Sequence, residues 1–477
     1  ARTLAPSPNE ICFLDAVDLA ARIHTRELSA TEVMTAFLVQ IERVNSEVNA
    51  ICTLLPDRAM RDAAHADQAL AQGQAVGPLH GLPIAIKDLV ETKGIRTTHG
   101  SPIYKDHVPD YDALTVQRLK AAGAIIIGKT NVPEFGAGSQ TFNQVFGATR
   151  NPYDLTKTCG GSSGGAAAAL ASGMLPLADG GDLGGSLRNP ASFCNVVGFR
   201  PSPGRVPSWP SELPWFPLGV LGPMARTVQD VAFLLSAMAG PDPRAPLSIE
   251  EPGSVFLGSL KRDFGGARMA WTPDLGRYPV EPAVIETCQS ALGTFADLGC
   301  HVEEATPDFA DADEVFQVLR AWAMAQEGKA DLEAHRDLIK DTVIWNVEKG
   351  LKLSGLDVSR AEAKHAALYH RVREFLEEYE FLVLPVSQVA PFSVETEWVT
   401  EINGIAMEPY IDGMGTCYAI TLTGLPAISV PCGFTPEGLP VGLQIVGRHH
   451  HDLEVLQMAY AFQQATQVGR TRPASAT

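Results

Sequence analysis

Three short segments of the chain bring serine, lysine and clustered glycine together. Serines stand inside the segment 160–165 (GGSSGG) and at the end of the segment 180–186 (GGDLGGS). A lone lysine, Lys87, lies in the apolar run 83–88 (PIAIKD). A serine hydroxyl becomes a nucleophile for a carbonyl carbon when a neighbouring base takes its proton. The three segments therefore predict a serine hydrolase whose base is lysine instead of histidine.

Clustered glycines give the backbone the freedom that such a site needs. Glycine adopts positive φ without strain and leaves successive N–H groups free to surround a negative charge. The segment 160–165 runs directly into the alanine-rich segment 166–171, which favours a helix. The positive N-terminal end of that helix would face the serines.

Lys87 can act as a base only when its ammonium group has lost a proton. That requires its pKa to fall from about 10.4 toward neutrality, and burial among apolar side chains lowers a lysine pKa in this way. The neighbours Ile84, Ala85, Ile86 and Leu89 favour such burial. The alternative is a lysine at a strand end that extends its amine to water.

The elements that must position these residues indicate a mixed α/β protein. A capping box of Ser29 and Glu32 opens a helix. From about residue 80 to 230, β-rich runs alternate with helical ones, and residues 427–446 repeat that character. We expect a central mixed β-sheet covered by helices on both faces.

The length of 477 residues is ample for a large buried core. We expect a single domain over residues 1–477. It would contain an N-terminal helical layer (1–75), a catalytic core (76–235), a charged helical cap over the site (310–380) and a C-terminal part of the core (396–477).

At its glycine-rich segments the chain resembles the amidase signature family. That family's motif joins GGSSGG to a downstream GGS that an arginine and a proline follow, as Arg188 and Pro190 do here. Segments similar to other family blocks occur in the family's order at 81–88, 128–135, 222–227, 422–431 and 438–444. The resemblance covers most of the chain and implies the family's α/β fold.

The resemblance also implies roles for three residues. Ser186 matches the nucleophile, Lys87 the base, and Ser162 a bridging serine that the family holds on a cis peptide. Neutral Lys87 would take a proton from Ser162, which takes one from Ser186 as its Oγ attacks the carbonyl. Taken alone, Ser162 would read as part of a turn with a helix N-cap, and its spacing to Ser186 favours the catalytic role.

Residues beside the nucleophile would shape and brace its loop, with Ser163 in a supporting role. By the resemblance, Asp182 and Arg188 brace the loop through a charge-assisted hydrogen bond, and the alternative is an ordinary surface pair. Gly181 departs from the family, which commonly has a hydroxyl residue there. The backbone N–H groups that match the oxyanion hole belong to Leu183, Gly184, Gly185 and Ser186.

Two segments bear on the substrate. Gly136, Ala137 and Gly138 match the family segment that lines the acyl pocket, and their small side chains imply room for a bulky or aromatic group. Residues 209–217 (WPSELPWFP) are too rich in proline for a helix or a central strand. The aromatic side chains of this loop either line an entrance or pack it onto the core.

Composition excludes several classes of partner. A net charge of −18 argues against binding to nucleic acid or to anionic membranes. Eight cysteines without a CxxC pair, and a start that lacks the apolar run of a signal peptide, favour a cytoplasmic location. The tract His449–His450–His451 reads as a solvated turn, and we expect no metal and no cofactor. A homodimer is left open.

These observations lead to one expected function and two alternatives. We expect hydrolysis of a C–N acyl bond, either an amide or a carbamate, in a small apolar or aromatic substrate. The first alternative is the glutaminase subunit of a tRNA-dependent amidotransferase, which shares these motifs but needs partner subunits. The second is a binding protein that retained the fold and lost catalysis.

Overall fold

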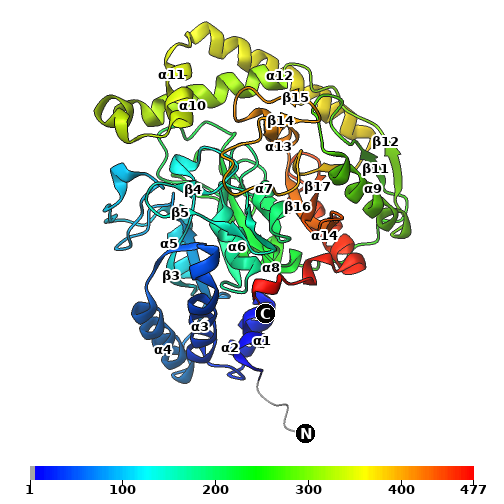
Figure 1. Ribbon diagram of the computed structural model, residues 1–477. Coiled ribbons are helices and arrows are strands. Elements are labelled where there is room, and N and C mark those ends of the chain that lie inside the picture. Colours follow the sequence, from blue (N-terminus) through cyan, green and yellow to red (C-terminus); the bar gives the residue numbers. More distant parts are fainter. Residues whose placement is uncertain (1–5, 477) are drawn as a thin grey trace.

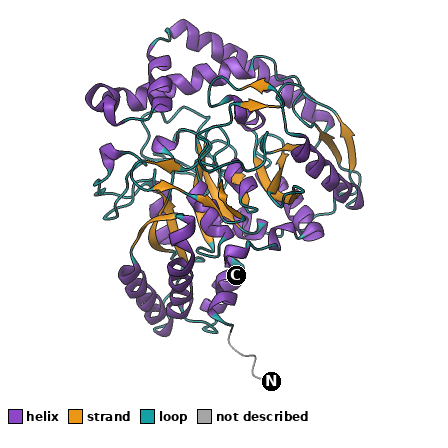
Figure 2. Ribbon diagram, viewed as in Figure 1, coloured by secondary structure: helices purple, strands orange, loops and turns teal. Residues whose placement is uncertain are grey.

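The computed structural model describes residues 6–476, and its centre is one mixed sheet of 11 strands in the order β1-β3-β2-β8-β10-β9-β16-β17-β13-β11-β12. Figure 2 shows the strands running through the middle of the molecule with helices around them. The strands are β1 (Ile51–Leu54), β2 (Pro83–Lys87), β3 (Ile125–Thr130), β8 (Leu177–Asp182), β9 (Val197–Arg200), β10 (Val220–Ala225), β11 (Arg268–Trp271), β12 (His301–Glu304), β13 (Phe381–Pro385), β16 (Ala427–Phe434) and β17 (Pro440–Val446).

Three small two-stranded sheets lie outside this sheet, formed by β4 (Phe142–Asn143) with β5 (Gly147–Ala148), β6 (Arg150–Asn151) with β7 (Asp154–Thr158), and β14 (Glu401–Ile402) with β15 (Ile405–Ala406). The helices are α1 (Pro8–Phe13), α2 (Ala16–His24), α3 (Ala30–Val48), α4 (Pro56–Ala71), α5 (Leu114–Ala121), α6 (Gly164–Ala171), α7 (Arg188–Phe193), α8 (Val228–Met238), α9 (Pro282–Asp297), α10 (Ala312–His335), α11 (Asp341–Leu351), α12 (Gly355–Glu378), α13 (Gly415–Leu422) and α14 (Asp452–Thr466). The expected α/β fold with a mixed sheet is confirmed.

Strand β2 shows how the sheet directs side chains to two different layers. Successive residues of a strand point to opposite faces. Ile84 and Ile86 pack into the apolar cluster that contains α2, α8 and α14, whereas Ala85 packs into the cluster that contains α3 and α6. Lys87 has the parity of Ala85. The strand therefore delivers the lysine side chain to the face of the sheet that α6 covers.

Helix α6 is built from glycine and alanine because it has almost no space around it. All of its residues are buried. A Cβ atom on Gly165 would lie 2.3 Å from the backbone nitrogen of Asn131 and 2.6 Å from the carbonyl oxygen of Ala50. The close approach sets the N-terminal end of α6, and with it the serines that precede the helix, against the end of β2.

The N-terminal segment is largely helical, as expected, with one difference. Helices α1 to α4 lie together at one end of the molecule (Figure 1), and Ser29 and Glu32 form the predicted capping box of α3. The difference is β1, which pairs antiparallel with β3 and forms an edge of the main sheet. The residues 51–54 (ICTL) are too few to show a periodicity of their own, so they gave no strand signal.

The second half of the chain supplies the other edge of the sheet and the cap. Strands β11 and β12 and helix α9 come from the segment 236–310, for which the sequence analysis made no prediction. The cap consists of α10, α11 and α12, which lie at the end opposite to the N-terminal helices in Figure 1. All three helices lie within residues 310–380, for which helical character was expected.

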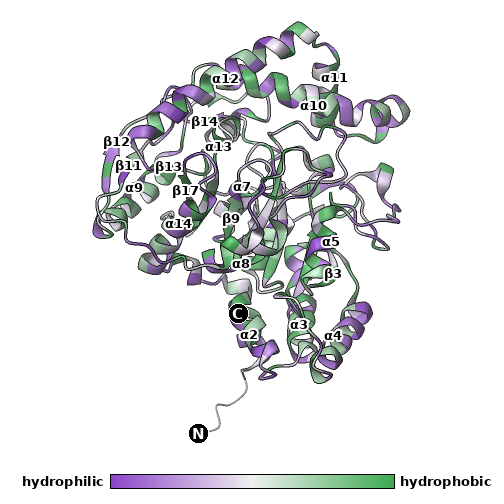
Figure 3. Ribbon diagram, turned by 180° about the vertical axis from the view of Figure 1, so that it is seen from behind, coloured by the Kyte–Doolittle hydropathy of each residue, from purple (hydrophilic) through white to green (hydrophobic). Residues whose placement is uncertain are grey.

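Hydropathy follows this layering. In Figure 3 the outer helices α12 and α4 carry many hydrophilic residues, whereas the ribbon around α8 is mostly hydrophobic.

All eight cysteines are free thiols. Within the described residues, no helix combines the length and the apolar character that crossing a membrane requires. The first five residues, which belong to the start that was compared with a signal peptide, lie outside the described part.

Replacement of Gly165 by alanine tests the tight packing of α6. The added Cβ would meet backbone atoms, which cannot rotate away. We expect Gly165→Ala to destabilise the protein by roughly 1 to 3 kcal/mol or more, measured as a lower midpoint of thermal unfolding. Gly355→Ala in α12 is the control, because no atom lies within 4 Å of its added Cβ. Equal midpoints for the two variants would contradict the packing described here.

Candidate active site

A cavity of about 690 Å³ opens between the sheet and the cap. It brings together Lys87, Ser162 and Ser186, which come from the end of β2, the residues before α6 and the residues before α7. Gly136, Ala137 and Gly138 line the same cavity. Residues from α10 and α11 form its cap side. The structure thus gathers the predicted relay residues and the predicted acyl-pocket segment in one place.

Lys87 ends β2 and is 2% exposed. Its Nζ lies 2.7 Å from Ser162 Oγ and 2.8 Å from Ser163 Oγ, with the carbonyl oxygen of Gly181 at 3.4 Å. The alternative in which this lysine extends to water is therefore wrong. The serine hydroxyls and one carbonyl group are its nearest polar contacts.

Burial lowers the pKa of Lys87 to about 7. The carboxyl groups of Asp179 and Asp182 oppose this effect by attracting a positive charge, but desolvation outweighs them. Asp179 also accepts a hydrogen bond from the backbone N–H of Lys87 at 2.9 Å. Asp179 was not predicted as part of the site, although an acid next to two glycines in an apolar strand is an unusual residue for such a position.

The two serines before α6 differ in their surroundings. The peptide bond between Gly161 and Ser162 is cis, which is the isomer that the resemblance implied. Ser162 lines the cavity, and its Oγ contacts Lys87. The Oγ of Ser163 lies 3.3 Å from both the nitrogen and the carbonyl oxygen of Gly181, so Ser163 joins the lysine to the strand that leads to Ser186.

The loop before Ser186 leaves backbone donors unused. Among the residues that the structure describes, the N–H groups of Leu183, Gly184 and Ser186 have no acceptor. Gly185 differs from the expectation, because its N–H donates to Asp182 Oδ1 at 3.1 Å. The carboxylate of Asp182 is folded beneath the loop and takes this donor, so three of the four expected groups remain available for an oxyanion.

Asp182 and Arg188 form a fully buried ion pair, not the surface pair considered as an alternative. Arg188 donates to both carboxylate oxygens, at 2.9 and 3.0 Å, and Arg200 donates to the same carboxylate at 3.0 Å. Burial alone would raise the pKa of Asp182, but the attraction of the two guanidinium groups holds it well below its usual range. Arg200 was missed, because it lies on β9 with no motif around it.

Gly181 leaves room for the side chain that the family commonly has there. A Cβ on this residue would lie 3.6 Å from Leu221 and 3.8 Å from Lys87 Nζ, both ordinary contact distances. The hydroxyl that the family places here is absent from this chain, and the nearby Ser163 Oγ contacts the Gly181 backbone instead. The departure therefore changes the surroundings of Lys87 without disturbing the packing.

The cavity-lining segment 136–138 is attached to the cap. Lys340, which precedes α11, donates from Nζ to the carbonyl oxygen of Ala137 at 2.7 Å. Its backbone N–H donates to Glu134 at 2.7 Å. Burial lowers the pKa of Lys340 to about 8. Gly136 lies close enough to the relay that an added Cβ would stand 3.6 Å from Ser162 Oγ.

Of the aromatic side chains in the loop 209–217, one lines the cavity, one packs against neighbouring side chains and one is exposed. Phe216 lines the cavity together with several prolines of the loop. Trp209 instead packs edge-on against Tyr111 and under the guanidinium of Arg244. Trp215 is 71% exposed. The loop therefore forms part of the cavity wall, but its tryptophans do not.

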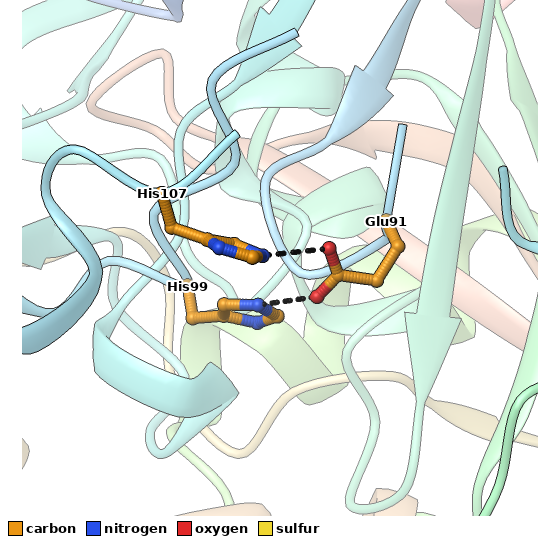
Figure 4. Close-up of side chains that lie close together, drawn as sticks. All are labelled: Glu91, His99 and His107. Carbon is orange, nitrogen blue, oxygen red and sulfur yellow. Dashed lines mark hydrogen bonds and ion pairs between the residues drawn. The ribbon is translucent and has the colours of Figure 1, made fainter. Parts of the chain in front are cut away.

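One cluster on the cavity wall has the residue types of a metal site. Glu91 accepts hydrogen bonds from Nε2 of His99 at 2.8 Å and of His107 at 3.1 Å, as Figure 4 shows. Their ligand atoms lie within 4.8 Å of one another, so these three residues could hold a cation. The two ring nitrogens that face Glu91 are already hydrogen-bonded to its carboxylate.

The tract His449–His451 forms the expected turn, with His449 and His450 exposed.

Removal of the buried carboxylate tests the brace beneath the loop. Asp182→Asn leaves the guanidinium groups of Arg188 and Arg200 buried without their counter-charge, which costs about 3 to 5 kcal/mol. We expect a markedly lower midpoint of thermal unfolding. Glu303→Gln, in the solvent-exposed pair with Arg268, is the control and should unfold as the wild type does. A wild-type midpoint for Asp182→Asn would contradict the bracing role.

Comparison with known proteins bears on this arrangement. The family model "Amidase" matches residues 32–456. An acylamidase of Rhodococcus erythropolis is 36% identical over 466 residues, which are 97% of each chain. A glutamyl-tRNA(Gln) amidotransferase subunit of Moorella thermoacetica is also 36% identical, over 97% of this chain and 99% of that one.

Solved structures give the same result. A bacterial aryl acylamidase of the amidase signature family superimposes with a TM-score of 0.91 at 28% identity, over 97% of this chain and all of that one. A 6-aminohexanoate cyclic dimer hydrolase superimposes with a TM-score of 0.89 at 28% identity, over 98% of this chain and 99% of that one. With the family model matched along most of its length, the chain belongs to the amidase signature family.

Proposed function

We propose that this protein is a serine-dependent hydrolase of C–N acyl bonds in small apolar or aromatic substrates. One observation carries the proposal: the buried amine of Lys87, with a pKa of about 7, lies 2.7 Å from Ser162 Oγ in the cavity that Ser186 lines. A lysine in this state is a proton acceptor at neutral pH. The unused N–H groups beside Ser186 supply the second requirement, a place for an oxyanion.

In this mechanism a proton passes from Ser186 through Ser162 to Lys87 and later returns along the same path. Neutral Lys87 takes the hydroxyl proton of Ser162, Ser162 takes that of Ser186, and Ser186 Oγ forms a bond to the carbonyl carbon. The oxyanion accepts hydrogen bonds from the unused N–H groups of the Leu183–Ser186 loop. Collapse breaks the C–N bond, and the amine leaves with the proton that returns from Lys87 through Ser162. Water then attacks the acyl-enzyme by the same relay.

The relatives support an amide as substrate, and the shared acyl-enzyme step extends the proposal to a carbamate. The wall next to the relay carries Gly136, Ala137 and Gly138, and Phe216 contributes an aromatic surface. An acylamidase and an aryl acylamidase are among the similar proteins. Carbamates are included because the acyl-enzyme step is the same for both bonds. We also propose a cytoplasmic enzyme, because all of its cysteines are free thiols.

A second candidate is the glutaminase subunit of a tRNA-dependent amidotransferase. Its support is the 36% identity to the Moorella thermoacetica protein over nearly the whole chain. That function needs partner subunits, so stable association with them and glutamine-dependent ammonia transfer would establish it. A binding protein without catalysis is disfavoured, because such a protein has no use for a buried lysine placed between serine hydroxyls.

Replacement of the nucleophile tests the proposal directly. Wild-type protein should release the chromogenic amine from aryl anilides or aryl carbamates, and Ser186→Ala should lower kcat by roughly 10⁶-fold. Ser208→Ala is the control, because Ser208 lines the cavity on the loop side without contacting Lys87. The ratio of anilide to carbamate turnover ranks the two substrate classes. Activity that survives in Ser186→Ala would refute the serine mechanism.

The pH profile tests the base. Because Lys87 must be neutral to accept a proton, kcat/KM should rise with pH through a midpoint near the lysine pKa of about 7 and level off above it. Lys87→Ala should lose nearly all amide hydrolysis at pH 7 to 8.

Lys129 offers a matched control for this profile. It is equally buried on the neighbouring strand but bonds a carbonyl group and two threonine hydroxyls instead of the serines. In a folded Lys129→Met variant the rise should stay near pH 7. A rise that moved in Lys129→Met, or that was absent from the wild type, would overturn the assignment of Lys87.

A further inference from the structure

Arg320 is a buried cation without a counter-charge. It lies on α10, is 2% exposed and is one of the residues that line the cavity. Its Nε donates to Asn346 Oδ1 at 2.8 Å. The terminal nitrogens Nη1 and Nη2 have no hydrogen-bond acceptor among the described residues. Four N–H donors of a guanidinium group therefore remain unused inside the protein.

Aromatic rings pack against this guanidinium group but accept none of the hydrogen bonds of its terminal N–H groups. Its central carbon lies 5.4 Å from the ring centre of Phe316 and 5.3 Å from that of Trp345. These contacts attract a cation weakly and accept no hydrogen bond from its edge. Burial lowers the pKa of Arg320, but a guanidinium group stays protonated in proteins. Natural proteins seldom bury such a charge unless a carboxylate or a ligand meets it.

A second unused donor lies next to Arg320. Asn346 accepts the Arg320 bond and donates from Nδ2 to the hydroxyl oxygen of Tyr410 at 2.8 Å. Tyr410 lines the cavity, and no acceptor for its own O–H is present within residues 6–476. The amide of Asn346 thus fixes the tyrosine and the arginine relative to each other. The unused N–H groups of Arg320 are buried beside this end of the cavity, so a ligand must enter next to them to accept their hydrogen bonds.

The carboxylates around the cavity do not neutralise Arg320. Glu91 is bonded to two histidines, Asp331 to the hydroxyl of Tyr104, and Glu212 to Gln326. Glu327 is exposed to water, which screens it. These four acids come from the residues after β2, the 209–217 loop and the far half of α10. A fifth lining acid, Asp182, is bonded to Arg188 and Arg200. None of the five is a partner of the buried guanidinium group.

The donor pair lies near the reacting bond. Phe316, which packs against Arg320, also lines the cavity, and its ring tip would be 3.3 Å from a Cβ on Gly184. Gly184 carries one of the unused N–H groups beside Ser186. The ring of Phe316 is therefore close both to the loop before Ser186 and to Arg320, whose guanidinium carbon lies 5.4 Å from the ring centre.

We propose that Arg320 and Tyr410 form a subsite for a carboxylate of the substrate, so that the enzyme prefers amides or carbamates that carry a carboxylate a few atoms from the scissile bond. This inference rests on the proposed function. It narrows the substrate class from small apolar acyl compounds to those with one anionic end. The remaining apolar wall of the cavity would hold the uncharged part of the molecule.

Matched substrates test the preference. N-phenylsuccinamate is compared with valeranilide, and 4-acetamidobenzoate with 4-acetamidotoluene, so that a carboxylate is present on the acyl side or on the amine side. Amine release should give the wild type at least a ~10-fold higher kcat/KM for the charged member of one pair. The preference should be lost in Arg320→Met and partly retained in Arg320→Lys.

Lys349 provides the control variant. Its ammonium group lies 5.0 Å from the same Trp345 ring, but it is bonded to Gln317 and is not among the residues that line the cavity. Lys349→Met removes one positive charge from α11 and should keep the preference. The inference would be overturned if Arg320→Met lowered kcat/KM equally for the charged and the neutral member of a pair. It would also be overturned if the wild type showed no preference for the charged member.

Two further readouts separate this role from a structural one. Arg320→Met replaces an uncompensated buried charge by an apolar chain, so its midpoint of thermal unfolding should equal or exceed that of the wild type, whereas a structural arginine would lower it. Glutarate should raise the midpoint of the wild type and not that of Arg320→Met. If neutral anilides are hydrolysed without a charge preference, only this inference is contradicted. If no substrate is hydrolysed, the proposed function is contradicted. In that case the glutarate result decides whether Arg320 binds a carboxylate.

Discussion

The site depends on a single desolvated amine. Lys87 is carried into the molecule by a strand whose isoleucines face one layer and whose alanine faces the other. The small alanine and glycine side chains of α6 allow the serines to reach the end of that strand, and the resulting burial lowers the lysine pKa to about 7. The apolar residues that enclose the amine thus help to keep it neutral near pH 7, including residues that never meet a substrate.

Asp182 has a comparable importance for the loop before Ser186, at the end of the strand next to β2. One carboxylate accepts bonds from the Gly185 and Leu187 N–H groups and from the guanidinium groups of Arg188 and Arg200. The loop before Ser186 is therefore folded around a negative charge beneath it. This carboxylate takes the Gly185 and Leu187 N–H groups, whereas those of Leu183, Gly184 and Ser186 have no acceptor among the described residues.

Local patterns in the sequence were sufficient for the features that depend on neighbours in the chain. The capping box of α3, the strand that ends at Lys87 and the helices α10 and α12 were all predicted. The partners of Asp182 and the isolation of Arg320 could not be, because they depend on which distant segments meet. Arg200 lies on a strand that only the sheet order brings beside Asp182. Phe316 lies four residues before Arg320 on the same helix, but Trp345 comes from another helix, and only the folded structure shows that the guanidinium group lacks an acceptor.

The bond between Lys340 and Ala137 has a consequence for how this enzyme can diverge. One lysine before α11 bonds the carbonyl group of Ala137 and the carboxylate of Glu134, so the cap is tied directly to the cavity wall beside Ser162. A substitution in the cap that moves Lys340 would therefore move this wall as well, although the residues around Lys87 are unchanged.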